Sequence, residues 1–496
     1  MFSRDGRAFG KVVQTLFALQ HRGQESCGIA YVRGKEMDFH KDMGWVRDVF
    51  PKKTWPTEAV HFAIGHTRYP TQGNVDVLNA QPHIVRYEGR NVLALASNGD
   101  LVNYYSIRKE LESEGLVFES ENDGELLVKY LFSRIYLHKE GVEQAIGRLM
   151  REVKGAYSAA LLTLEAMYVF RDPWGIRPLI YGYDPQTQSY YAVSESCALD
   201  ILGIRDIRAI LPGEVLRLDE SGVHRLGRPI VSTRHFHCVF ELIYFSRPDS
   251  LIFDLPPPKE ALFPPDNKEM VPLYIHHFRK ELGRKLGERD KGVLDVDFVI
   301  PIPDSGNFIA LGYAEATGIP FQMGLIRSHY VGRTFIRPEQ RYRDQDVREK
   351  FNPVPGLLEN KKIVVVDDSI VRGTTLKLLI RMLRRTKVKE VHLRIGSPPM
   401  RYPCFYGIDT PKREELIANQ AGFGPAVSQK EIERVVGEYL GVDSLHYLSL
   451  AELKRIAQPI DQFCYACFSG KYPIGVKEKP FITVSEDISD SRAQKG

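Results

Sequence analysis

The run that decides the fold is Ile363-Val-Val-Val-Asp-Asp-Ser-Ile-Val-Arg-Gly-Thr-Thr375. It opens with four consecutive β-branched residues, which predict a strand buried on both faces, as in a parallel sheet covered by helices. Two aspartates follow at the carboxyl end of that strand, where open α/β sheets bind their ligands. A short loop rich in Ser, Gly and Thr comes next, and an amphipathic helix begins near Leu376. The run therefore predicts a strand, a ligand-binding loop and a helix.

The chemistry of this loop indicates a phosphorylated ribose. Backbone N–H groups and hydroxyls at a helix N-terminus suit a phosphate. Aspartates beside a phosphate repel it unless they bind something else, such as ribose hydroxyls or Mg²⁺. The alternative is an ordinary capped helix, in which one aspartate serves as the cap. That alternative accounts for one Asp and one Thr but not for the whole set.

Bulk properties exclude several classes of protein. The chain has 496 residues, 43% of them hydrophobic and 26% charged, which fits an ordinary protein of about two to four domains. A net charge of +4 without a long basic block gives no support for nucleic-acid binding. No apolar stretch reaches the roughly 18 residues of a membrane helix. The first residues, Met1 to Arg7, lack the apolar core of a signal peptide, so we expect a cytoplasmic protein.

Two patterns of secondary structure divide the chain. Up to about residue 230, strands and grouped helices alternate with turns, which predicts a layered α+β sandwich. The strands are expected at 60–65, 92–96, 156–164 and 190–193, and the helices at 9–20, 105–114 and 126–137. Strands expected at 297–302, 363–366 and 391–395 alternate with helices, which is typical of a parallel sheet. A Pro-rich segment around 246–266 predicts an exposed connection or insertion between the two parts.

Two more loops could bind ligand. Pro301-Ile-Pro-Asp-Ser-Gly306 follows a predicted strand, and Tyr330-Val-Gly-Arg-Thr-Phe-Ile336 precedes a group of arginines. Those arginines could hold a pyrophosphate or simply solvate a loop. They are Arg337, Arg341, Arg343 and Arg348.

Four of the six cysteines are candidates for a metal site. Cys464 and Cys467 form a C-x-x-C pair, and Cys238 and Cys404 are each flanked by aromatic residues. In a reducing compartment a C-x-x-C pair favours a metal over a disulfide. Together the four thiols could bind zinc or an iron–sulfur cluster, and their spacing alone does not choose between the two. The remaining cysteines, Cys27 and Cys197, lie in apolar stretches and are expected in the core.

Taken together, these motifs resemble the glutamine phosphoribosylpyrophosphate amidotransferase family. The resemblance spans nearly the whole chain. Its further landmarks are Gln20-His-Arg-Gly-Gln-Glu25, His66-Thr-Arg-Tyr69, Ser97-Asn-Gly-Asp-Leu-Val-Asn103, Asn122-Asp-Gly-Glu125 and Tyr244-Phe-Ser-Arg-Pro-Asp249.

The resemblance implies a four-layer α+β glutaminase domain of the N-terminal-nucleophile type. A type I phosphoribosyltransferase domain with an α/β parallel sheet then follows. We expect the first domain at 1–235 and the second at 236–470, with the Pro-rich insert near 251–268 and a tail at 471–496. The family makes 5-phosphoribosylamine, pyrophosphate and glutamate from phosphoribosyl pyrophosphate (PRPP), glutamine and water, in the first step of purine synthesis.

In the glutaminase half, the resemblance assigns Arg68 to the α-carboxylate of glutamine, a task that suits a guanidinium. Asp123 would take the α-ammonium group. Asn98 and the N–H of Gly99 would form the oxyanion hole.

The family's nucleophile has no counterpart here. Its mature chain begins with a catalytic cysteine whose free amine serves as the base, in a strand before the first helix. This sequence begins with Met1-Phe2 and enters the helix expected at 9–20 almost at once. Cys27, the nearest thiol, falls in an apolar strand and is expected to face the core. A start codon placed too far downstream, a fragment, and a true loss of glutaminase activity remain open, and we favour the first.

In the synthase half, the resemblance assigns Asp367 and Asp368 to the ribose, directly or through Mg²⁺. Ser305 would lie at that metal, and the loop with Arg333 would close over PRPP. The residues implied around the 5′-phosphate are Ser369, Val371, Arg372, Gly373, Thr374 and Thr375. The family commonly has Lys-Asn-Arg before the tyrosine of the closing loop, where this chain has Arg327-Ser-His-Tyr330. Contacts to pyrophosphate are therefore expected to differ.

The resemblance also implies cofactors and partners. Many family members hold a [4Fe–4S] cluster with cysteines that match Cys238, Cys404, Cys464 and Cys467, and zinc in the same site is the alternative. Purine nucleotides are expected as feedback inhibitors, and a homodimer or homotetramer as the assembly. Two other functions stay open. One is a phosphoribosyltransferase that uses free ammonia, and the other is a non-catalytic regulator that binds PRPP or nucleotide.

Overall fold

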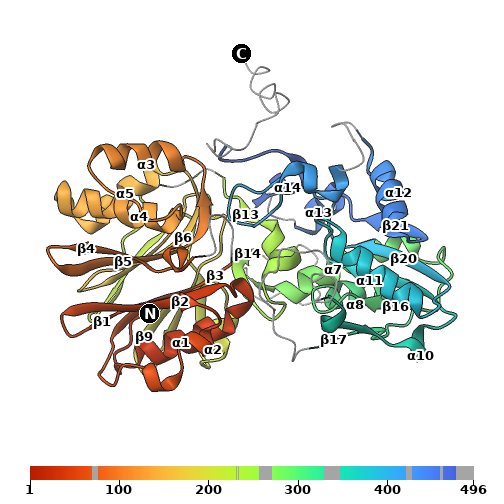
Figure 1. The fold of residues 1–496 in the computed structure, drawn as a ribbon, viewed down its shortest axis with the longest axis horizontal. Helices are drawn as coiled ribbons and strands as arrows, with labels where there is room; N and C mark the ends of the chain where they lie inside the picture. Colours follow the sequence, from red (N-terminus) through yellow and green to blue (C-terminus); the bar gives the residue numbers. More distant parts are fainter. Residues whose placement is uncertain are drawn as a thin grey trace, which may run out of the picture.

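Antiparallel strands dominate the N-terminal half of the chain and parallel strands the C-terminal half, and the two halves lie side by side (Figure 1). The structure is a computed structural model that describes residues 1–69, 76–230, 232, 234–255, 271–328, 347–419, 427–457 and 462–475. None of the helices among these residues combines the length and apolar character that a bilayer crossing requires.

The first sheet of the N-terminal half is antiparallel and has the strand order β12-β11-β7-β6-β5-β4. Its strands are β4 (His83–Tyr87), β5 (Arg90–Leu101), β6 (Gly155–Leu162), β7 (Met167–Arg171), β11 (Val215–Asp219) and β12 (Gly222–Arg225). β5 is the longest of them and pairs with β6 as far as Leu101. Its last residues therefore reach the side of the domain that faces the C-terminal half.

The second sheet consists of two three-stranded ladders, β2-β1-β3 and β10-β8-β9. Their strands are β1 (Ser26–Arg33), β2 (Glu36–Met43), β3 (Phe62–Arg68), β8 (Ile180–Asp184), β9 (Ser189–Val193) and β10 (Asp206–Ala209). Phe2 bridges them, because it pairs with Phe62 on one side and Tyr190 on the other. The Met1 amine donates to the carbonyl of Ala63 at 2.7 Å, and burial lowers the pKa of that amine to about 4.

Helices cover both outer faces of the two sheets, which gives four layers. Figure 1 shows α3, α4 and α5 on one side of the strands and α1 on the other. The helices are α1 (Ala8–Ala18), α2 (Val46–Val49), α3 (Tyr104–Ser113), α4 (Asp123–Phe132), α5 (Val142–Glu152) and α6 (Cys197–Asp200). Ile64, Ala96 and Leu216 belong to the apolar core between the sheets. The four-layer prediction is confirmed.

The C-terminal half is built on a parallel sheet with the order β16-β19-β20-β21, namely Phe298–Pro301, Lys362–Asp367, Glu390–Ile395 and Ser444–Tyr447. Helices α7 (Ile275–Asp290) and α8 (Asn307–Thr317) pack on one face, and α11 (Thr374–Arg385) and α12 (Gln429–Leu440) on the other. Glycine allows α7 and α8 to approach closely, since a Cβ on Gly283 would lie 1.8 Å from the carbonyl oxygen of Ile309. The predicted α/β sheet is confirmed.

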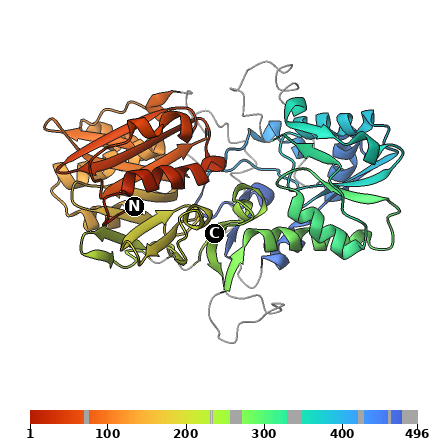
Figure 2. The ribbon, with the colours of Figure 1, turned by 90° about the horizontal axis from the view of Figure 1, so that it is seen from below.

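Short elements connect the halves and complete the C-terminal one, as the view from below shows (Figure 2). The ladders are β13 (His237–Cys238) with β22 (Phe463–Cys464), β14 (Leu251–Leu255) with β15 (Val271–Tyr274), and β17 (Leu325–Arg327) with β18 (Phe351–Pro353). The short helices are α10 (Pro355–Leu358), α13 (Leu450–Ile456) and α14 (Ala466–Ser469). Helical turns are Gln20–Arg22, Lys52–Thr54, Val77–Asn79, Ser133–Leu137, Glu241–Phe245, Arg413–Glu415 and Ile417–Asn419.

Three boundaries differ from the sequence-based expectation. The strand expected at 60–65 runs instead from Phe62 to Arg68. Its last three residues, His66, Thr67 and Arg68, are therefore polar. The helix expected at 126–137 already begins at Asp123, because the Asn122 side chain accepts a hydrogen bond from the N–H of Gly124 and caps it. The connection expected to be exposed contains strand β14, whose first residues are buried. The rest of that Pro-rich insert, 256–270, lies outside the described residues.

Candidate active site

A cavity of about 1200 Å³ lies between the two halves and is lined by residues from both. It brings together nearly all the ligand-binding residues predicted from the sequence. Those that line it are Arg68, Asn98, Gly99, Asp123, Ser305, Asp367, Asp368, Ser369, Val371, Arg372, Gly373, Thr374 and Thr375. Arg333 and the rest of its predicted closing loop lie outside the described residues.

Arg68 ends strand β3 and points a buried guanidinium at Glu25. The distance from its Nη1 to Glu25 Oε1 is 2.5 Å. Burial lowers the pKa of Arg68 and raises the pKa of Glu25, and the ion pair opposes both shifts. Glu25 was part of a sequence landmark but had no predicted role.

Asp123 stands at the first turn of α4, next to its Asn122 cap. Its Oδ2 accepts a hydrogen bond from the N–H of Leu101 at 3.0 Å, which ties the helix to the end of β5. Arg68 and Asp123 therefore lie on two elements that border the same cavity, and they offer one cation and one carboxylate. That pairing of charges complements an α-amino acid.

Gln81, which the sequence did not single out, holds the chain next to Asn98. Its Nε2 donates to the carbonyl of Ser97 at 3.1 Å, and its Oε1 accepts from the N–H of Ser97 at 2.7 Å. One buried amide thus fixes both backbone groups of the residue before the predicted oxyanion hole. Gly99 has φ +151°, and a Cβ there would lie 2.0 Å from the carbonyl oxygen of Ala156, so only glycine fits.

Asp367 ends strand β19 at the carboxyl edge of the parallel sheet, and Asp368 follows it, as predicted. Both are buried, and the N–H of Asp368 donates to Asp367 Oδ1 at 2.9 Å. Burial and the neighbouring charge of Asp368 raise the pKa of Asp367 well above its usual range. Two carboxylates this close favour a bound cation or hydroxyl donors over solvent.

The loop after these aspartates leads into α11, and the N-terminus of this helix borders the cavity. Gly373 has φ +73° and precedes α11, whose first residues are Thr374 and Thr375. A Cβ on Gly373 would lie 2.4 Å from Ile417 Cδ1, so the turn requires glycine. Arg372 is held outward by Glu415, with 2.9 Å between Nη2 and Oε2. Unpaired backbone N–H groups at such a terminus suit a phosphate.

Comparisons with known proteins agree with both halves. Residues 73–200 match the glutamine amidotransferase domain family, and residues 311–395 match the phosphoribosyl transferase domain family. The amidophosphoribosyltransferase of Methanocaldococcus jannaschii is 39% identical over 480 residues, which is 94% of each chain. That of Bacillus subtilis is 39% identical over 465 residues, 92% of this chain and 90% of its own. The chain belongs to the amidophosphoribosyltransferase family.

Solved structures support the same family. An allosteric regulatory enzyme of purine biosynthesis superposes with a TM-score of 0.82 at 38% identity, covering 95% of each chain. The glutamine PRPP amidotransferase of B. subtilis in complex with ADP and GMP gives a TM-score of 0.79 at 38% identity, covering 95% of this chain and 96% of that one. The relative placement of the two halves is therefore one that this family of transferases adopts.

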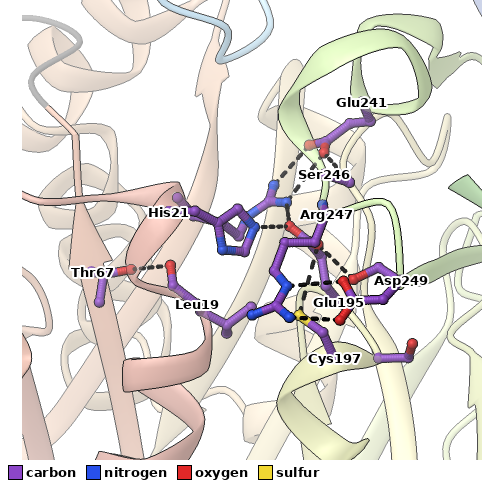
Figure 3. Close-up of polar contacts among 12 residues, drawn as sticks. Leu19, His21, Thr67, Glu195, Cys197, Glu241, Ser246, Arg247 and Asp249 are labelled. Atoms are coloured by element: carbon purple, nitrogen blue, oxygen red, sulfur yellow. Dashed lines mark hydrogen bonds and ion pairs between the residues drawn. The ribbon is translucent and has the colours of Figure 1, made fainter. Parts of the chain in front are cut away.

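In this amidotransferase, a buried ionic network joins the halves beside the cavity. Figure 3 shows Glu195 and Glu241 gathered with His21 between the halves. Arg22 bonds Glu241 through both Nη atoms, at 2.7 and 3.1 Å, and also bonds Glu195. His21 Nε2 lies 2.7 Å from Glu195 Oε1. The sequence contained the landmark 20–25, but nothing in it indicated these distant partners.

Arg279 of α7 supports the segment that leads into the cavity. Its guanidinium donates to the carbonyls of Leu242, Tyr244 and Ser246 at 2.6–3.0 Å. Burial lowers its pKa to about 10, and the charge of Asp368 opposes that shift. Arg279 therefore fixes the interdomain segment on the wall of the cavity that Asp368 also lines.

The four cysteines of the predicted metal site lie at the junction, and none of them lines the cavity. Cys238 and Cys464 are direct partners in the β13–β22 ladder, and Cys467 follows in α14. Burial raises the pKa of Cys467 well above its usual range, and the other three thiols raise it further. The Sγ of Cys404 accepts the N–H of Tyr406 at 3.3 Å. Within the described part of the chain, no group of three or more His, Cys, Asp or Glu side chains is arranged to hold a metal ion.

Proposed function

We propose that this family member makes 5-phosphoribosylamine from PRPP, with glutamine or ammonia as the source of nitrogen. The observation that carries the proposal is the single cavity between the halves, which is lined by an amino-acid site and a phosphoribosyl site. Ammonia released at one site would reach the other without leaving the protein, so water and competing reactions are kept away.

At the phosphoribosyl site, Asp367 and Asp368 would hold the ribose hydroxyls, and the N-terminus of α11 would hold the 5′-phosphate. The donor set of two buried carboxylates fits Mg²⁺, with Ser305 on the facing loop. When bound, Mg²⁺ would offset the charge of the departing pyrophosphate. The protein's own contribution would be to orient the anomeric carbon toward the amino-acid site and to exclude water.

At the amino-acid site, Arg68 would bind the α-carboxylate of glutamine and Asp123 its α-ammonium group. Asn98 and the N–H of Gly99 would stabilise the oxyanion as the amide carbon becomes tetrahedral. Hydrolysis also needs a nucleophile, and no cysteine lines the cavity among the described residues. Cys27 is 1% exposed in the core, and burial raises its pKa to about 12. We therefore propose ammonium as an alternative to glutamine as the nitrogen donor at the phosphoribosyl site.

At the cysteine site we propose a [4Fe–4S] cluster. One buried and three half-buried cysteines and a backbone N–H donated to sulfur fit a cluster. We favour the cluster over zinc because the four cysteines match the positions that the family resemblance implies for it, and zinc in the same site is the alternative. The cluster would fix the chain end to the domain junction.

Purine nucleotides are proposed as inhibitors, because a relative of 38% identity was solved with ADP and GMP. A competing function is a regulator that binds PRPP without turning it over. The intact pair Asp367–Asp368 and the open helix N-terminus argue for catalysis over that alternative.

Initial rates of pyrophosphate release test the proposal. The purified chain is supplied with PRPP and Mg²⁺, and then with ammonium, glutamine or neither. Release that requires ammonium supports the transferase, and trapping of phosphoribosylamine by mass spectrometry identifies the product. Saturable PRPP binding without release would favour the regulator. Release with glutamine at the rate seen with ammonium would mean that a nucleophile outside the described cavity residues acts.

A further inference from the structure

Asp409 is a carboxylate on the wall of the cavity that neither proposed substrate site uses. Its neighbours in the chain from Gly407 to Pro411 line the cavity as well. Ile408 and Pro411 are buried, whereas the side chain of Asp409 is exposed. The hydroxyl of Thr410 accepts the N–H of Cys404 at 2.7 Å and fixes the turn that carries the carboxylate.

The segment around Asp409 runs along the cavity from the amino-acid site to the phosphoribosyl site. At one end, a Cβ on Gly407 would lie 2.9 Å from the Cα of Gly99, which is the residue proposed for the oxyanion hole. At the other end, the N–H of Ile417 donates to the carbonyl of Val371 in the proposed phosphate loop, at 2.9 Å. Two residues separate Asp409 from Gly407, which places the two Cα atoms within about 7 Å of each other. Asp409 therefore borders the stretch of the cavity between the two sites.

The carboxylate of Asp409 makes no hydrogen bond or ion pair with another side chain in the described part of the chain. The charged groups that act on it are Arg372 and Glu415, which pair with each other at 2.9 Å. Burial raises the pKa of Asp409, and the charge of Arg372 opposes that shift. Because PRPP carries several negative charges, a carboxylate beside it is unfavourable unless it binds a cation or accepts a proton.

We propose that Asp409 is a catalytic residue that accepts the proton of the attacking nitrogen during transfer to PRPP. This inference rests on the proposed function. The lone pair of ammonia forms the bond to the anomeric carbon, and the bond from that carbon to pyrophosphate breaks, with its electron pair leaving on the pyrophosphate oxygen. The nitrogen is then positively charged, and one of its protons passes to the carboxylate of Asp409, which leaves neutral phosphoribosylamine. Asp409 later returns the proton to water.

The test measures pyrophosphate release by the full-length wild type and by Asp409→Asn, with saturating PRPP and Mg²⁺ and with ammonium as the nitrogen donor. A positioned base contributes about 10²–10⁴-fold, so Asp409→Asn is expected to lower kcat by about 100-fold or more, while the KM for PRPP changes by less than about twofold. Asp409→Glu keeps a carboxylate on a longer side chain and should retain part of the rate. Glu414→Gln is the matched control, because Glu414 is an exposed carboxylate of the same part of the chain that does not line the cavity. It is expected to keep the wild-type kcat.

A pH profile separates a base from a residue that only supports the fold. At a constant concentration of free ammonia, the wild-type kcat is expected to fall as the pH drops through the raised pKa of Asp409, because a protonated carboxyl group cannot accept a proton. Asp409→Asn should lose this dependence, and Glu415→Gln, which removes the neighbouring carboxylate, should keep it. An acid dependence that Asp409→Asn retains would belong to another group and would overturn the inference.

A wild-type kcat in Asp409→Asn, or an effect confined to the KM for PRPP, would also overturn it. If the wild type itself releases no pyrophosphate with ammonium, the proposed function is wrong and this inference falls with it. If circular dichroism shows that Asp409→Asn does not fold, the pH profiles of the wild type and of Asp409→Glu decide. A flat wild-type profile overturns the inference, and an acid dependence whose midpoint shifts in Asp409→Glu supports it.

Discussion

Gly407 of the C-terminal half packs against Gly99 of β5, so closely that a Cβ on Gly407 would lie 2.9 Å from the Cα of Gly99. Gly99 is the residue proposed to supply an oxyanion-hole N–H. The phosphoribosyl half thus contacts the backbone at the centre of the glutamine site directly. A movement of the segment around Gly407 would therefore displace the backbone of Gly99 directly, because no side chain lies between them.

Gly407→Ala is expected to weaken glutamine binding by about tenfold or more, since overpacking costs roughly 1–3 kcal/mol. Calorimetric titration with glutamine measures the effect. Gly318→Ala is the matched control, because Gly318 also has positive φ (+77°) but no atom within 4 Å of an added Cβ. Equal effects of the two substitutions would show that backbone strain, and not the contact, is responsible.

Arg68→Met is expected to weaken glutamine binding by about 10- to 150-fold, because a hydrogen bond to a charged group contributes roughly 1.5–3 kcal/mol. Arg68→Lys should recover only part of the affinity, since it loses the two-pronged contact. The rate with ammonium is expected to be retained, because Arg68 belongs to the other end of the cavity. Arg33→Met, at an exposed arginine paired with Asp38, serves as the control. Unchanged glutamine affinity in Arg68→Met would contradict the assignment.

Asp367→Asn and Asp368→Asn are expected to raise the KM for PRPP at least tenfold in the ammonium assay, because each removes a charged acceptor from the ribose and metal site. Asp295→Asn, at a side chain that is 95% exposed, should leave KM unchanged. A normal KM in both cavity variants would move the PRPP site elsewhere.

Glu195→Gln is expected to lower the free energy of unfolding by about 3–5 kcal/mol at pH 7, because it leaves the buried Arg22 with one carboxylate in place of two. Burial alone would raise the pKa of Glu195, but Arg22 and His21 outweigh it and lower the pKa below the usual 4.5. The stabilisation is therefore fully present above about pH 4.5 and is lost as pH falls through the lowered pKa.

Denaturant unfolding of wild type and Glu195→Gln at pH 7 and below pH 4.5 checks this, and the difference between them should shrink in acid. Glu438→Gln is the control, because Glu438 pairs with Arg434 on an exposed helix face. It should change stability by less than about 1 kcal/mol at either pH. A difference that stays constant with pH would mean that the pKa of Glu195 is the same in the folded and unfolded states.

The sequence predicted the residues of the phosphoribosyl site well because they are local. A buried strand, two aspartates and a glycine before a helix all fall within 363–375, so one run of sequence carries the geometry. The alternation of strands and helices likewise predicted both layered architectures. The predicted start of a helix was wrong where a capping residue determines it, as at Asn122, which caps α4.

The supporting residues could not be predicted, because their partners are distant in sequence. Gln81, which precedes β4, binds Ser97 of β5, and Arg22 binds Glu241 from 219 residues away. Nothing in the local sequence around a buried glutamine or arginine reveals which backbone it will reach. Such contacts depend on how the two halves pack, which only the folded chain defines.

The most direct test of the central claim is a crystal structure with Mg²⁺, glutamine and a stable PRPP analogue bound together. The account predicts the 5′-phosphate at the loop from Val371 to Thr375 and the ribose against Asp367 and Asp368. It predicts glutamine in the same cavity, with its α-carboxylate at Arg68. Ordered ligand outside this cavity, or an analogue whose phosphate lies away from the N-terminus of α11, would contradict it.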